Sequence, residues 1–285
     1  MVKRRYLRLL IFALFSQCEC LSVVGGGLAA AGFTGFFGWA FQGVGPTENA
    51  QACLNSLPHT SIDSLNALRI GSKNPSVALY CGAKVRPESY APLAAKIIEV
   101  LEQQEEGEEE AGVLILQSPF NMYCFKPATV EKVLDTYPSV TSIVGHSIGG
   151  LWAAEYCRDL YTADRWPDGK DLSFFYMGVH GKSLNFQQFR DLPFANVAFS
   201  YASEDITLKN ACGDGGIDEY LAKIRHDLPD GAKLVEIPGG NHEQYGSYGS
   251  PGYAQGLAYK DFPAKISEES QIELVATAIA TMERG

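Results

Sequence analysis

The stretch VTSIVGHSIGGLWAA, residues 140–154, decides the fold because it joins a strand pattern to a helix pattern through glycines. Its first five residues, VTSIV, have the pattern of a strand that is buried on both faces. The residues after Gly145-His-Ser147-Ile-Gly149 form an apolar helical pattern, and this motif has the spacing G-x-S-x-G. A sharp turn from strand to helix lifts the hydroxyl of the central serine above the sheet. We therefore predict that Ser147 is a nucleophile and that the N–H of Ile148, at the helix start, faces the oxyanion that such a serine would generate.

Short apolar runs alternate with helical stretches on both sides of this motif. Such alternation indicates an α/β fold with a mainly parallel sheet of about six strands and helices on both faces. The connection between the fourth and fifth runs is shorter than about 20 residues, which predicts that no large cap is inserted there. The expected strands are residues 77–80, 113–116, 142–144, 174–179, 197–201 and 233–237.

A serine hydroxyl becomes a good nucleophile only when a neighbouring base takes its proton. His242 lies in PGGNH, directly after the last expected strand, and sites form at the carboxyl ends of parallel strands. We predict that His242 is the base. The other histidines fit less well, because His146 is expected to point away from the reacting side of Ser147 and His180 comes before any candidate acid. The remaining two, His59 and His226, are expected before the core and on a helix surface.

An acid must then orient the imidazole and stabilise its charged form. Asp205 follows the expected strand at residues 197–201 and lies between Ser147 and His242 in the chain. We predict that Asp205 is this acid. Its main rival is the adjacent Glu204, and two further candidates are Asp214 and Asp218.

The second oxyanion donor is expected in the loop after the first core strand, CGAK at residues 81–84. Gly82 permits a tight turn there, and we predict that the N–H of Ala83 joins that of Ile148 in holding the oxyanion.

The composition excludes several partners. The formal net charge of −10 at pH 7 argues against nucleic acid, because phosphate binding needs clustered Lys and Arg. The seven cysteines form no C-x-x-C pair, so no metal site is predicted. The glycine-rich residues 25–32 follow no strand, so no dinucleotide site and no other cofactor is predicted.

The N-terminus has the pattern of a targeting segment or a membrane anchor. Basic residues 3–5 precede an apolar run, which predicts a signal or targeting segment over residues 1–20. Residues 21–44 are uncharged and long enough to span a bilayer, so they are a possible transmembrane anchor. The alternative is a cleaved organelle-targeting leader followed by a flexible linker. Residues 45–72 are expected to be a linker or an edge element, and residues 73–285 the catalytic domain.

Five segments, taken together, resemble the single-domain α/β-hydrolases grouped as alpha/beta hydrolase fold-5. They are residues 78–94, 117–122, 145–150, 202–205 and 239–249, and the last of them, GGNHEQYGSYG, is the most specific. The resemblance runs from about residue 75 to the C-terminus. The sequence departs from the family pattern at Cys81, where proline is commoner, and at Ala202, where glycine is commoner.

The resemblance implies an α/β-hydrolase fold and a triad of Ser147, Asp205 and His242. It also implies a serine hydrolase that cleaves a small ester-like substrate, such as a carboxylic ester or a thioester, without a cofactor. Many members carry an N-terminal hydrophobic segment, which favours the anchor. The expected location is a membrane or the secretory pathway, with an organelle as the alternative. Two alternatives are a lactone hydrolase of the dienelactone type and a membrane-tethered binding protein with the same fold but no catalysis.

Overall fold

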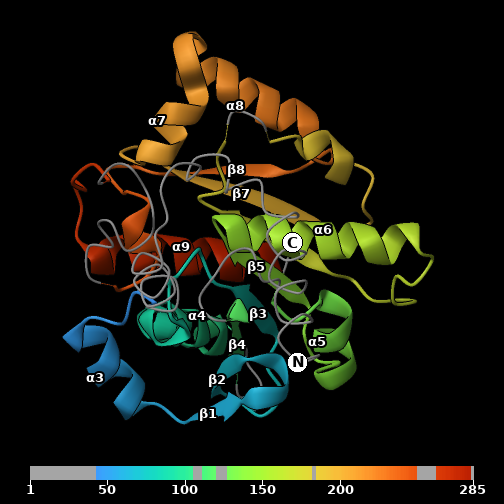
Figure 1. Cartoon of the computed structure of the whole chain (residues 1–285), viewed down its shortest axis with the longest axis vertical. Coiled ribbons are helices and arrows are strands. Elements are labelled where there is room, and N and C mark those ends of the chain that lie inside the picture. The colour runs from blue at the N-terminus through green and yellow to red at the C-terminus, as the bar shows by residue number, and fades with distance from the viewer. Residues whose placement is uncertain (1–42, 105–110, 120–126, 182–183, 249–260, 284–285) are drawn as a thin grey trace, which may run out of the picture. The chain divides into compact units, whose positions relative to one another are not determined.

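A computed structural model describes residues 43–104, 111–119, 127–181, 184–248 and 261–283 (Figure 1). The predicted targeting segment and nearly all of the predicted anchor lie outside these residues. Among the helices that the structure describes, none is both long and apolar enough to cross a membrane.

The centre of the fold is a sheet of eight strands in the order β1-β2-β4-β3-β5-β6-β7-β8. The strands from β3 onward pair in parallel, whereas β2 pairs antiparallel with both β1 and β4. The strands are β1 His59–Ile62, β2 Ala67–Gly71, β3 Val77–Tyr80, β4 Gly112–Leu116, β5 Ser142–His146, β6 Ser173–Met177, β7 Asn196–Ala202 and β8 Lys233–Ile237.

The six predicted strands are β3 to β8, so the prediction of about six strands was two too few. β1 has no continuous apolar run, because three of its four residues are exposed. β2 was not counted among the strands because Arg69 interrupts the apolar pattern, although residues 45–72 were expected to be a linker or an edge element. The Arg69 guanidinium donates to the Thr60 hydroxyl on β1 at 3.3 Å. Residues 59–71 therefore extend the sheet at one side.

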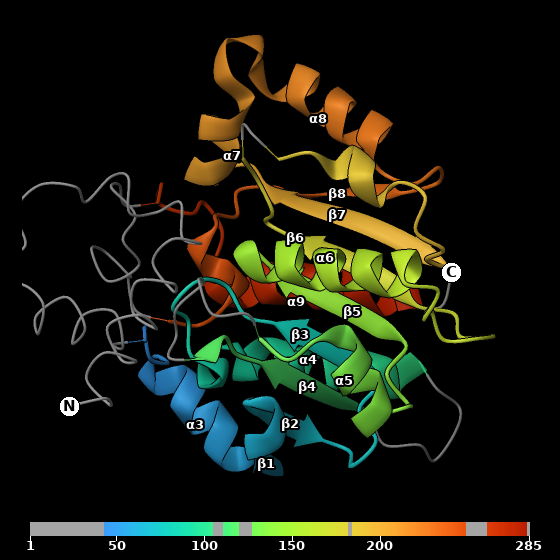
Figure 2. The ribbon, with the colours of Figure 1, turned by 45° about the vertical axis from the view of Figure 1, so that its right-hand side comes forward.

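Helices cover both faces of the sheet. They are α3 Glu48–Ser56, α4 Ala91–Gln104, α5 Val130–Thr136, α6 Ile148–Thr162, α7 Ile206–Cys212, α8 Gly216–Asp227 and α9 Glu268–Glu283. Figures 1 and 2 show α4 and α9 together on one side of the sheet and α5 and α6 on the other. Two separate clusters of buried apolar side chains match this division, because one contains Leu79 with residues of α4 and α9 and the other contains Tyr80 with residues of α5 and α6.

The alternation of strand and helix brings the loops after β3, β5, β7 and β8 to one edge of the sheet, the carboxyl edge of the parallel strands. The connection from β6 to β7 runs from residue 178 to residue 195, and its described part contains one short 3₁₀ helix, Phe186–Phe189. This connection has no inserted domain, as predicted.

Candidate active site

Ser147 occupies a strained turn between β5 and α6. Its backbone has φ 53° and ψ −126°, a conformation that residues other than glycine rarely adopt. Such strain costs of order 1–3 kcal/mol and persists only where the surrounding structure enforces it. The Ser147 N–H donates to the carbonyl of Met177 on β6 at 2.9 Å, and the Ser147 carbonyl accepts from the Gly150 N–H at 3.1 Å. These bonds hold the serine at the tip of β5.

Three glycines allow this turn because the backbone approaches itself too closely for side chains. A Cβ on Gly145 would lie 2.2 Å from Cα of Gly150, and one on Gly149 would lie 2.3 Å from the carbonyl oxygen of Cys81. A Cβ on Gly150 would lie 2.7 Å from the carbonyl oxygen of Gly145. The sequence G-x-S-x-G-G is therefore a packing requirement at this site.

Asp205 and His242 meet beside the turn. Asp205 is the N-cap of α7, where its Oδ1 accepts from the backbone N–H groups of Thr207 and Leu208 at 2.6 and 3.1 Å. Its Oδ2 is 2.8 Å from Nδ1 of His242, which follows β8. Both side chains are buried. The cap fixes one carboxylate oxygen and leaves the other for the imidazole.

The pair is electrostatically coupled. Burial raises the pKa of Asp205, but the charge and hydrogen bond of His242, aided by the Thr207 hydroxyl, outweigh burial and hold this pKa below its usual range. Burial likewise lowers the pKa of His242, and the charge and hydrogen bond of Asp205 overcome it, so that the pKa of the imidazole is raised. The arrangement favours an ionised Asp205 and a basic His242.

Ser147 and His242 line one small cavity with a volume of about 60 Å³ among the described residues. Ala83, whose N–H was predicted to bind the oxyanion, lines the same cavity. Ile148 is the first residue of α6, and the first N–H groups of a helix have no partner inside it. The full lining is Gly82, Ala83, Val85, His146, Ser147, Thr207 and His242.

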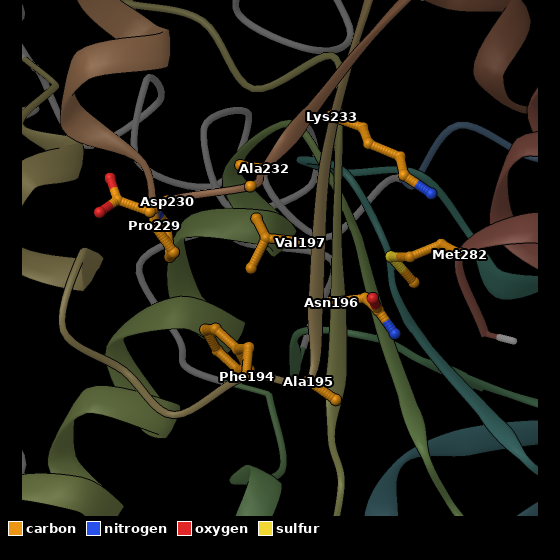
Figure 3. A pocket seen from close by; sticks show the side chains of 10 residues that line it. Phe194, Ala195, Asn196, Val197, Pro229, Asp230, Ala232, Lys233 and Met282 are labelled. Carbon is orange, nitrogen blue, oxygen red and sulfur yellow. The ribbon is translucent and has the colours of Figure 1, made fainter. Parts of the chain in front are cut away.

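A larger cavity, of about 180 Å³, lies at the other edge of the sheet, near the amino ends of β7 and β8 (Figure 3). Asn196 and Lys233, the first residues of these strands, contribute to its wall together with Asp230. No serine, cysteine or histidine is among its lining residues. We therefore place the chemistry in the smaller cavity.

The rival acids lie elsewhere. The carboxylate of Glu204 pairs with Lys265 at 2.7 Å and with Lys209 at 3.0 Å, so it is engaged away from the imidazole. Asp214 and Asp218 lie in exposed positions between α7 and α8 and on α8. Asp205 is thus the candidate acid that contacts His242.

His146 and Tyr90 were not expected at the site, and the prediction that His146 points away from the reacting side of Ser147 was wrong. His146 lines the cavity, and its Nδ1 is 2.8 Å from the hydroxyl of Tyr90. That hydroxyl also accepts from the N–H of Gly82 at 2.9 Å. The imidazole of His146 packs against that of His242, with ring centroids 4.8 Å apart. Tyr90 and His146 therefore connect the loop of Ala83 to the turn of Ser147, a contact that no sequence spacing indicates.

His180 is a second imidazole near the acid. Its Nε2 lies 3.6 Å from Oδ2 of Asp205, and its side chain is fully buried against Phe199 and Tyr220. Burial lowers the pKa of His180 to about 4, so the ring is neutral at pH 7. Sequence reasoning set His180 aside on chain order, although its place just after β6, at the carboxyl edge, was a usable signal.

Together, the eight-stranded sheet and the strained serine beside a buried acid–imidazole pair define the class of α/β-hydrolases. Residues 76–170, which contain the Ser147 turn, match the model of the alpha/beta hydrolase family. This match, together with the observed architecture, confirms the resemblance to α/β-hydrolases and the fold class predicted from the sequence.

The chain is also similar to solved structures. One is carboxyl esterase 2 from the fungus Tuber melanosporum, with 14% identity, a TM-score of 0.46, and coverage of 80% of this chain and 87% of that chain. Another is the esterase domain of a Rhodothermus marinus protein, with 11% identity, a TM-score of 0.45, and coverage of 79% and 97%. A third is an α/β-hydrolase enzyme from the metagenome of Lake Arreo, Spain, with 11% identity, a TM-score of 0.48, and coverage of 99% and 96%. No curated protein matches the sequence.

Proposed function

We propose that this protein hydrolyses an ester-like bond, a carboxylic ester or a thioester, through an acyl-enzyme on Ser147. The observation that carries the proposal is the 2.8 Å contact between Asp205 and His242 at a cavity that the strained Ser147 also lines. A buried carboxylate on Nδ1 leaves Nε2 of the imidazole free of a proton, as a general base requires.

In the proposed mechanism, His242 takes the proton of Ser147 as Oγ attacks the carbonyl carbon of the substrate. The N–H groups of Ala83 and Ile148 stabilise the resulting oxyanion. The protonated imidazole then gives its proton to the leaving alcohol or thiol, and the acyl group stays on Oγ. Water, activated by His242, attacks this acyl-enzyme and releases the acid. Asp205 stabilises the imidazolium in both halves of the reaction.

Hydrolysis of short-chain p-nitrophenyl esters by the full-length chain tests the proposal. Ser147→Ala should lower kcat/KM by at least about 10³-fold, because the nucleophile and base act as a unit. Ser142→Ala is the matched control, since Ser142 is a buried serine at the start of β5, the strand that leads to Ser147, and its hydroxyl has no hydrogen-bond partner among the described residues. Equal activity of the wild type and Ser147→Ala would exclude Ser147 as the nucleophile.

A fluorophosphonate probe separates an enzyme from a binding protein with the same fold. The wild type and Ser142→Ala should be labelled, whereas Ser147→Ala should not. A folded wild type that resists the probe at Ser147 would favour the binding role.

We further propose that the N-terminal segment associates the protein with a membrane of the secretory pathway. The support is the uncharged stretch of residues 21–44 behind a basic leader. Carbonate washing of membranes from expressing cells should leave the full-length chain in the pellet, and its release would overturn the anchor.

A further inference from the structure

Asp261 places a buried carboxylate beside the two loops that supply the acid and the base. Its Oδ1 accepts from the backbone N–H of Ile206 at 2.9 Å and from its neighbour Phe262 at 3.0 Å. Its Oδ2 accepts from the N–H of Glu243 at 3.0 Å. Asp261 itself belongs to neither loop, because it lies between residue 248 and α9.

The two cross-loop bonds fall on equivalent positions. Ile206 directly follows Asp205, and Glu243 directly follows His242. Each N–H belongs to the peptide plane that carries the carbonyl carbon of the preceding residue, so holding the N–H fixes the backbone beside the functional side chain. One carboxylate thus fixes the backbone next to both members of the pair.

Its charge acts on the same pair. Burial and the nearby charge of Asp205 raise the pKa of Asp261, while the two backbone bonds oppose this rise. The charge of Asp261 in turn contributes, after Asp205, to raising the pKa of His242. The groups that face His242 are Asp205, Asp261 and Glu243 as acids, His146 and His180 as imidazoles, and the side chains of Thr207 and Tyr245.

We propose that Asp261 is a positioning residue that fixes the distance between Asp205 and His242. This inference rests on the proposed function for its consequence in catalysis. The contact geometry of the three groups carries it, and Asp261 is not required to touch the substrate.

Asp261→Asn is the first test, because it keeps the shape but turns an amide N–H₂ toward one of the backbone donors. We expect kcat to fall about 10- to 100-fold with a smaller change in KM, as a displaced catalytic group would cause. The acid limb of the kcat/KM profile should also move to lower pH, because His242 loses a neighbouring negative charge.

Glu204→Gln is the matched control. It removes one negative charge from the residue next to Asp205, but the Glu204 carboxylate contacts Lys209 and Lys265 rather than the backbone of the two loops. The bond from the Glu204 backbone N–H to the Gly240 carbonyl is kept in this variant. We expect its kcat and its pH profile to match those of the wild type.

Titration of the His242 imidazole by NMR in the full chain makes the test independent of ester hydrolysis. The pKa of His242 should be lower in Asp261→Asn and unchanged in Glu204→Gln. An unchanged pKa in folded Asp261→Asn would overturn the inference, whereas failure of the proposed function would instead show as equal activity of the wild type and Ser147→Ala.

Asp261→Glu keeps the test decisive if the asparagine variant does not fold. It retains the charge and both acceptors but displaces them by one methylene, so kcat should fall while the acid limb stays near that of the wild type. Wild-type kcat in Asp261→Glu would contradict a positioning role.

Discussion

The hydroxyl of Tyr90 offers the sharpest test of how the site is held together. It is fully buried, accepts from the Gly82 N–H at 2.9 Å and lies 2.8 Å from Nδ1 of His146. Tyr90→Phe removes this oxygen and leaves the ring in place. Two buried polar groups then lose their partner at once.

The two lost hydrogen bonds determine how far Tyr90→Phe should lower the stability and kcat. An unsatisfied buried group costs roughly 1–3 kcal/mol, so the two together should lower the free energy of unfolding by about 2–6 kcal/mol. The Ala83 N–H follows Gly82 directly, and losing one oxyanion donor costs about 10²–10³-fold in kcat. Tyr90→Phe should loosen this loop without removing the donor. It should therefore lower kcat by about 10-fold or more, but by no more than the loss of the donor itself would.

Urea unfolding and the separate measurement of kcat and KM on one p-nitrophenyl ester give both quantities. Tyr80→Phe is the matched control, because Tyr80 is equally buried and its hydroxyl donates to the carbonyl of Ala128, away from the cavity. The control should lose stability but keep kcat. Wild-type kcat in Tyr90→Phe would refute the view that this hydroxyl holds the oxyanion loop.

Three further predictions follow from the site. Gly149→Ala should destabilise the fold by about 3 kcal/mol or more in urea unfolding, because its Cβ meets backbone oxygens at 2.3 and 2.5 Å, whereas Gly169→Ala, with open space and φ 64°, should cost only about 1 kcal/mol. The kcat/KM value should rise with pH through a pKa above about 6.5, because His242 is a base only when neutral and its pKa is raised. A kinetic pKa at or below the ordinary imidazole value would contradict the coupling of Asp205 and His242. Asp205→Asn should lower kcat by about 10⁴-fold at pH 7, as it favours the wrong tautomer of His242, and a loss below about tenfold in ester assays would argue for another acid.

The sequence predicted the parts of this molecule that rest on local pattern. The strands β3 to β7 were found because buried parallel strands are mostly apolar, as in Gly112–Leu116, where every residue is buried. Ser147, Asp205 and His242 were chosen by chain order and by their places after strands. Among these, the contact of Asp205 with His242 is seen in the structure, and their catalytic roles stay predictions.

The residues that were missed depend on tertiary contacts. Tyr90 reaches His146 across 56 positions, through a 3₁₀ helix at Pro87–Tyr90 that no apolar period marks. Asp261 touches the two loops from 18 and 55 positions away. Neither contact follows from spacing, because a side chain that holds another loop leaves no repeat in its own segment.

The two outermost strands of the sheet also bear on how the protein behaves at high concentration. On β1, His59, Thr60 and Ser61 are exposed, and on β8 the charged Lys233 and Glu236 are exposed. Unpaired strand edges are templates for self-association, and short, polar or charged edges discourage it. The sheet therefore ends on both sides in strands that are poorly suited to recruiting a further strand from another molecule.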